Sequence, residues 1–118
     1  MHEAYVQSAV LILEPGADER APGASVTVAL CGHWEHEPPC PLSPHHVQAD
    51  RVGDELRVRV LFATEPETEP EVRRRIELAL SGNWPFPDGF TTPWRLQRSW
   101  PEEVSPREQI HAEHLILS

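Results

Sequence analysis

The feature that most constrains the fold is a period-two pattern of apolar residues from Leu56 to Phe62. Apolar side chains occupy every second position, and Arg57 and Arg59 lie between them. Because successive side chains of a β-strand point to opposite faces, the pattern predicts a strand with one buried face. The turn residues Gly53-Asp54 separate it from strand signals that begin at Val47, so a hairpin is expected here.

A helix is predicted over about 69–81. Thr68 and Glu71 have the spacing of a capping box, and a proline between them is tolerated in the first turn of a helix. Apolar residues follow at helical spacing, namely Val72, Ile76, Ala79 and Leu80. Gly82 is placed to end the helix in a left-handed conformation, and Glu71 and Arg75 form a favourable pair on its exposed side.

The rest of the chain offers weaker signals. Strands are expected at Tyr5–Leu13, at Ala24–Leu30 with Val26, Val28 and Leu30 on one face, and at Gln109–Leu117. The proline-rich stretch Asn83–Arg107 has no sustained periodicity, so we expect a long ordered wrap over the sheet. The predicted fold is therefore α+β, a single small domain over residues 1–118, with a mostly antiparallel sheet of about five strands and one main helix.

Composition narrows the classes of function. A chain of 118 residues, 39% of them hydrophobic, is expected to form one modest core. Ten basic residues, all arginines, face 19 acidic ones, and the net charge of −9 disfavours binding to nucleic acid or to an anionic membrane. The lack of lysine excludes Schiff-base catalysis and a phosphate-loop lysine.

The location bears on the state of the two cysteines. No cationic segment precedes the short apolar run Ala9–Leu13, which is shorter than the core of a signal peptide, so a cytoplasmic location is expected. In a reducing compartment, Cys31 and Cys40 are expected to be free thiols or metal ligands. In an exported protein, a Cys31–Cys40 disulfide is the alternative.

The densest cluster of reactive side chains extends from Cys31 to His46 and holds both cysteines and four of the seven histidines. Thiolate and imidazole are ligands that suit zinc, and a structural zinc site needs four of them. Proline residues in the segment reduce the entropy lost when it closes around an ion. We therefore expect a zinc site, with copper or nickel as alternatives, whose candidate ligands are Cys31, His33, His36, Cys40, His45 and His46.

Other interpretations of this segment stay open. Its spacing matches none of the standard paired zinc motifs, and a cysteine is often only a small buried hydrophobe. His33 and His36 are three residues apart in a proline-rich loop, whereas zinc proteases need a different spacing on a helix. Neither a serine-nucleophile elbow nor a nucleotide-binding fingerprint occurs. An enzyme is therefore the minority expectation, no catalytic residue is assigned, and the metal would have a structural or accessory role.

Three histidines lie outside the cluster, namely His2, His111 and His114. In the strand expected at Gln109–Leu117, His111 and His114 are three residues apart and would point to opposite faces. At most one of them can then join the metal ligands.

A second functional class is a metal-free interaction or regulatory subunit. Trp84, Trp94 and Trp100 lie in the proline-rich stretch, and a Trp/Pro-rich surface over 84–100 is typical of contacts with a protein partner. The alternative is that these tryptophans complete the core of a small domain. A homodimer through an unprotected sheet edge is also compatible with the sequence.

Overall fold

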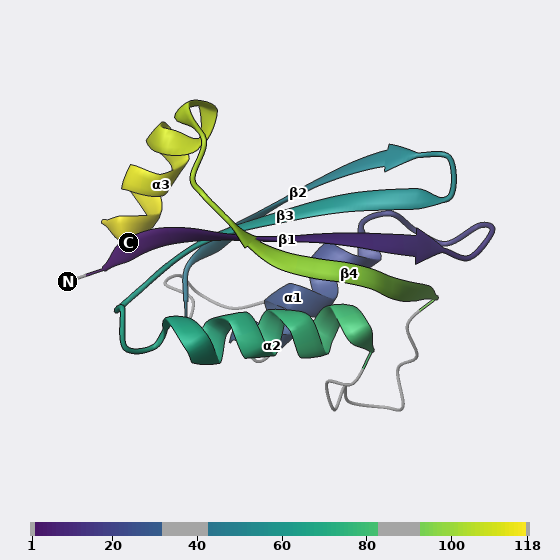
Figure 1. The fold of residues 1–118 in the computed structure, drawn as a ribbon, viewed down its shortest axis with the longest axis horizontal. Coiled ribbons are helices and arrows are strands. Elements are labelled where there is room, and N and C mark those ends of the chain that lie inside the picture. The colour runs from purple at the N-terminus through teal and green to yellow at the C-terminus, as the bar shows by residue number, and fades with distance from the viewer. Residues whose placement is uncertain (1, 32–42, 83–92, 118) are drawn as a thin grey trace.

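The computed structural model describes residues 2–31, 43–82 and 93–117. Within them the chain forms an α+β fold with four strands and three α-helices (Figure 1). The elements in chain order are β1 (Glu3–Leu13), α1 (Ala21–Cys31), β2 (His45–Val52), β3 (Glu55–Thr64), α2 (Glu69–Ser81), β4 (Trp94–Glu102), the 3₁₀ turn η2 (Pro106–Glu108) and α3 (Gln109–Ile116). The predicted fold class is confirmed, with one strand fewer and two helices more than expected.

The sheet has the strand order β2-β3-β1-β4, and all three neighbouring pairs are antiparallel. β1 lies in the interior of the sheet, where Ser8 is opposite both Arg59 of β3 and Trp100 of β4. The predicted hairpin is β2–β3, with Gly53 at a φ of 66° in its turn. Together with its two crossover helices, this arrangement is the βαββαβ, or ferredoxin-like, topology.

The two faces of the sheet are covered unequally. Helices α1 and α2 lie side by side against one face, and the short α3 covers one end of the other (Figure 1). The main core fills the space under α1 and α2 and contains the apolar residues at every second position of β3, namely Leu56, Val58, Val60 and Phe62. Under α3 there is a smaller cluster of Val6, Leu61 and Ala112.

The prediction for α2 is confirmed in its bounds, its buried residues and its end. Gly82 has a φ of 80°, in the left-handed region, and its N–H donates to carbonyls of the last turn. The Glu71–Arg75 pair is present at 2.9 Å. The capping box is wrong, because the Thr68 side chain makes no capping hydrogen bond. The carboxylate of Glu71 instead accepts hydrogen bonds from Arg74 and Arg75.

The strand predicted at Ala24–Leu30 is wrong, since these residues belong to helix α1. The buried residues of α1 follow helical spacing, namely Pro22, Ser25, Val26, Ala29 and Leu30. The alternation of small and β-branched residues in this segment favours a strand only weakly. The packing of α1 against the sheet and against α2 overrides that preference.

The last third of the chain also differs from the prediction. Trp94–Glu102, expected as part of an irregular wrap, is strand β4 and pairs with β1. A shift in register between Val10 and Leu11 of β1 interrupts the alternation that would have marked β4 as a strand. The strand predicted at Gln109–Leu117 is instead helix α3, Gln109–Ile116.

A capping box that the sequence analysis missed precedes α3. The Ser105 side chain and the Glu108 side chain bond reciprocally to each other's backbone N–H groups, with a proline at the first position of the turn. This spacing, a serine followed three residues later by glutamate, was the available signal for a helical start.

Candidate functional site

The structure gives side-chain positions for two of the six predicted metal ligands. His33, His36 and Cys40 lie outside the described residues, and Cys31 is the last residue of α1. His45 and His46 are the first two residues of β2.

His45 and His46 point to opposite faces of the sheet. His45 is opposite Phe62, which lies in the main core under α1 and α2, whereas His46 is opposite Leu61, which lies in the cluster under α3. Directly opposed residues of an antiparallel pair share a face, and neighbours along one strand do not. The sheet therefore separates these two imidazoles, so they do not converge on one ion.

The ring of His45 is held by two hydrogen bonds inside the protein. Its Nδ1 lies 3.1 Å from the backbone oxygen of Ser43, which can only accept, so Nδ1 carries a proton. Its Nε2 lies 3.0 Å from the hydroxyl oxygen of Thr27 in α1. Both ring nitrogens are engaged, and as a metal ligand His45 would have to give up the contact with Thr27.

The chain is firmly anchored where it enters β2. Ser43 is fully buried, and its hydroxyl donates to the backbone oxygen of Ala63 at 2.7 Å. The N–H of Ala63 donates in turn to the oxygen of Pro44. With the Thr27–His45 contact, these bonds fix the start of β2 against both α1 and the end of β3.

His46 lies on the other face, next to a histidine that the cluster prediction did not include. Its ring centroid is 4.6 Å from that of His111 in α3, with the two rings tilted by 49°. Both residues are exposed to solvent. The expectation that His111 and His114 sit on opposite faces of a strand is wrong, because the segment is helical; His111 is the one that reaches His46.

An open groove of about 490 Å³ runs between the sheet and the segment that leads from β4 into α3. His46 and His111 line one part of it, and Arg59, Glu102, Glu103 and Glu108 are among the residues that line the rest. The groove is therefore rich in charged and imidazole groups.

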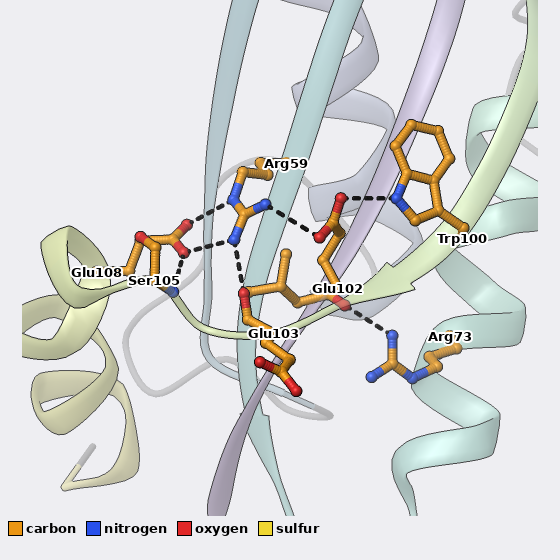
Figure 2. A network of polar contacts seen from close by, with 8 residues as sticks. Arg59, Arg73, Trp100, Glu102, Glu103, Ser105 and Glu108 are labelled. Carbon is orange, nitrogen blue, oxygen red and sulfur yellow. Dashed lines mark hydrogen bonds and ion pairs between the residues drawn. The ribbon is translucent and has the colours of Figure 1, made fainter.

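Arg59 is the centre of a polar network in this groove (Figure 2). It binds the carboxylate of Glu108 with two hydrogen bonds, from Nε at 3.0 Å and from Nη2 at 2.7 Å. Nη2 also donates to the backbone oxygen of Glu103 at 2.8 Å. The two bonds from Arg59 to the carboxylate of Glu108, followed by those from Ser105, lower the pKa of Glu108 to about 2. The network joins β3 to the start of α3.

Beyond α3, no helix of the described residues covers the same face of the sheet (Figure 1). Here the guanidinium of Arg98 lies 5.1 Å from the ring centroid of Trp100, and the indole N–H of Trp100 donates to Glu102. Trp100 is half-buried, whereas Trp94 is 6% exposed and donates from its indole to the oxygen of Leu80 in α2. Trp94 therefore belongs to the core, and Trp84 lies outside the described residues.

No set of three or more His, Cys, Asp or Glu side chains in residues 2–31, 43–82 and 93–117 is arranged to hold a metal ion. The contact between His46 and His111 brings two imidazoles together, which is half the number of ligands that a tetrahedral zinc site needs. In the same residues, no helix is long and apolar enough to cross a membrane.

No protein-family model matches the chain, and no curated protein is significantly similar to it in sequence.

Proposed function

We propose that this chain is a small metal-binding protein that holds a zinc ion, or copper or nickel in its place, with ligands from the segment 31–46. The observation that carries the proposal is the hydrogen bond between Thr27 and His45. Thr27 lies one turn before the end of α1 at Cys31, and His45 begins β2, so this contact brings together the two ends of the segment that carries the other ligands.

Closing a loop in advance favours metal binding. The entropy of bringing the loop ends together is lost when the domain folds, so it is not lost again when the ion binds. Since His45 already serves to close the loop, the proposed ligands are drawn from Cys31, His33, His36, Cys40 and His46. Thiolate ligands need a reducing environment, so the proposal includes a cytoplasmic location and a structural or accessory role for the metal.

The test is the metal content of tag-free protein purified without added metal or chelator. We expect about one zinc, copper or nickel per chain, lost in Cys40→Ala and retained in the matched control His2→Ala, a histidine outside the segment. Less than about a tenth of an equivalent, with no uptake by the reduced protein, would overturn the proposal. An intact mass lower by two hydrogens without reductant would identify the alternative Cys31–Cys40 disulfide.

The part of the sheet that no described helix covers favours a second candidate, an interaction or regulatory subunit. Of the tryptophans at 84–100, Trp94 lies in the core, whereas Trp100 is half-buried and has the guanidinium of Arg98 over its ring. Large aromatics and arginine are the residues that dominate binding at protein interfaces. A partner retained in a pull-down by the wild type but not by Trp100→Ala would favour this candidate. Its retention by Trp100→Ala would exclude the proposed surface.

A further inference from the structure

We infer that His46 and His111 together form a two-histidine site for a divalent transition metal, and that a bound ion clips α3 onto the sheet. The inference extends the proposed metal function, on which it rests for the role of His46, to a residue in the last helix. The observation behind it is the contact between two imidazoles from β2 and α3, with their ring centroids 4.6 Å apart.

The geometry suits shared coordination. Tetrahedral zinc at about 2.0–2.1 Å from each nitrogen requires two ligand nitrogens about 3.3 Å apart. Rings at this separation reach that distance by rotation about their side-chain bonds. Both histidines are exposed, so water can fill the remaining positions, and neutral imidazole is a ligand for zinc, nickel and copper alike.

The two histidines are also held in place before any ion binds. β2 is paired with β3 along its whole length. α3 is fixed by the two bonds from Arg59 to Glu108 and by the packing of Ala112 against Val6 and Leu61. Ligands that are already positioned lose little conformational entropy on binding, which favours chelation over binding to a single histidine.

The charges around the groove favour a cation. Glu102, Glu103 and Glu108 line it together with Arg59 and Arg107, and Glu108 is neutralised by Arg59. Glu102 and Glu103 against Arg107 leave one net negative charge in the groove, and the whole chain carries a net charge of −9. The long-range field of the protein therefore attracts a divalent cation.

Because the ligands belong to two separate elements, metal binding and the docking of α3 are linked. An ion that binds only when both imidazoles are adjacent stabilises the docked helix in proportion to its affinity. Removal of the metal would weaken the cover over Val6 and Leu61, the small apolar cluster on this face.

The experiment uses the full chain, freed of metal with a chelator and then titrated separately with Zn²⁺ and Ni²⁺. The readouts are the affinity for each metal, the melting temperature and amide exchange in Ile110–Ile116. We expect metal to raise the melting temperature and to slow exchange in α3. His46→Ala and His111→Ala should each weaken binding at least tenfold, about 1.4 kcal/mol, whereas His114→Ala in the same helix should leave it unchanged.

The outcomes separate this inference from the proposed function. Binding that depends on His46 and Cys40 but not on His111 would overturn the inference and leave the metal function of the segment standing. Binding that depends on His46 and His111 but not on Cys40 would support the inference alone, and no binding by the wild type would overturn both. If His111→Ala lowers the melting temperature of the metal-free protein, the binding test is repeated with His111→Gln, which keeps a polar side chain of similar size. Unchanged amide exchange in α3 with metal bound would overturn the inference that the ion holds α3 against the sheet.

Discussion

The two faces of the sheet are stabilised by different forces, although the same strands form both. The face under α1 and α2 is a continuous apolar core that includes Phe62, while the face under α3 combines the small cluster around Leu61 with the ion pair of Arg59 and Glu108. Phe62 and Leu61 are neighbours in one strand and point to opposite sides. A shift of one position along β3 thus changes burial in a large core into burial in a small cluster beside a polar network.

The contrast teaches how each face responds to a perturbation. Apolar burial involves no titrating group and is sensitive to cavities, whereas a charged hydrogen-bonded pair depends on the protonation of its acid. We therefore expect the first face to set the overall stability of the domain and the second to set the stability of α3.

The largest expected effect is a cavity in the main core. Phe62→Ala should lower the free energy of unfolding by about 3–5 kcal/mol, and Leu61→Ala by about 2 kcal/mol, because fewer groups surround Leu61. Urea denaturation with an unchanged m-value is the measurement. Val52→Ala at a side chain that is 60% exposed is the control and should have little effect. Equal losses of unfolding free energy in Phe62→Ala and Leu61→Ala would contradict the expectation that the face under α1 and α2 sets the overall stability.

Next in size is the loss of the network that holds α3. Arg59→Met should cost about 1–3 kcal/mol, since Glu108 then loses two charge-assisted hydrogen bonds. Hydrogen exchange should become faster in α3 and stay unchanged in α2. Arg20→Gln, which removes an exposed ion pair with Asp18, is the matched control. Faster exchange throughout the domain would mean that the network supports the whole fold and not only α3.

The pH dependence of this face follows from the same pair. The pKa of Glu108 is about 2 in the folded protein, below its value of about 4.3 in an unfolded chain. The stabilisation is therefore complete above about pH 5 and is lost as the pH falls towards 2. Glu108→Gln should flatten the decline in α3 stability over this range, as followed by exchange or circular dichroism.

A matched control for that pH series is Glu71→Gln in α2. The pKa of Glu71 is also lowered to about 2, by hydrogen bonds from Arg74 and then Arg75, but the pair lies on the exposed surface of the helix. Solvent screening should make its contribution smaller than that of Glu108. A steeper loss of pH dependence in Glu71→Gln than in Glu108→Gln would contradict the role given to the α3 network.

The smallest effect is expected on the open part of the second face. Arg98→Ala removes the cation–π contact with Trp100, which is worth about 0.5–1 kcal/mol at an exposed site. The melting temperature should therefore change by only a few degrees. A loss as large as that of Arg59→Met would show that this region is structurally tied to the rest of the face.

Local signals in the sequence predicted the elements that depend on local interactions. The β2–β3 hairpin follows from alternation and from Gly53, and α2 follows from its apolar stripe and from Gly82. α1 was missed because Val26, Thr27 and Val28 favour a strand in isolation, and the helical spacing of Ser25, Val26 and Ala29 becomes decisive only when the sheet and α2 cover it.

The candidate site was less accessible from sequence. His46 belonged to a dense local cluster, but its contact with His111 depends on α3 folding back over β3 and β1, which no short spacing encodes. The same is true of Arg59 and Glu108, whose pairing joins distant segments. The capping box at Ser105 is a local signal from which a helix could have been predicted in the last segment. That prediction would have made His111 a candidate neighbour of the sheet.

The interior position of β1 also orders events during synthesis. Its register partners in β3 and β4 extend to Thr64 and Glu102, so a chain emerging from the ribosome holds β1 without a neighbour until β3 has been made, and with one open edge until β4 follows. During that interval a strand that is buried along most of its length offers unpaired backbone to other chains. A chain shortened before Trp94 would keep that edge permanently, and we expect it to aggregate.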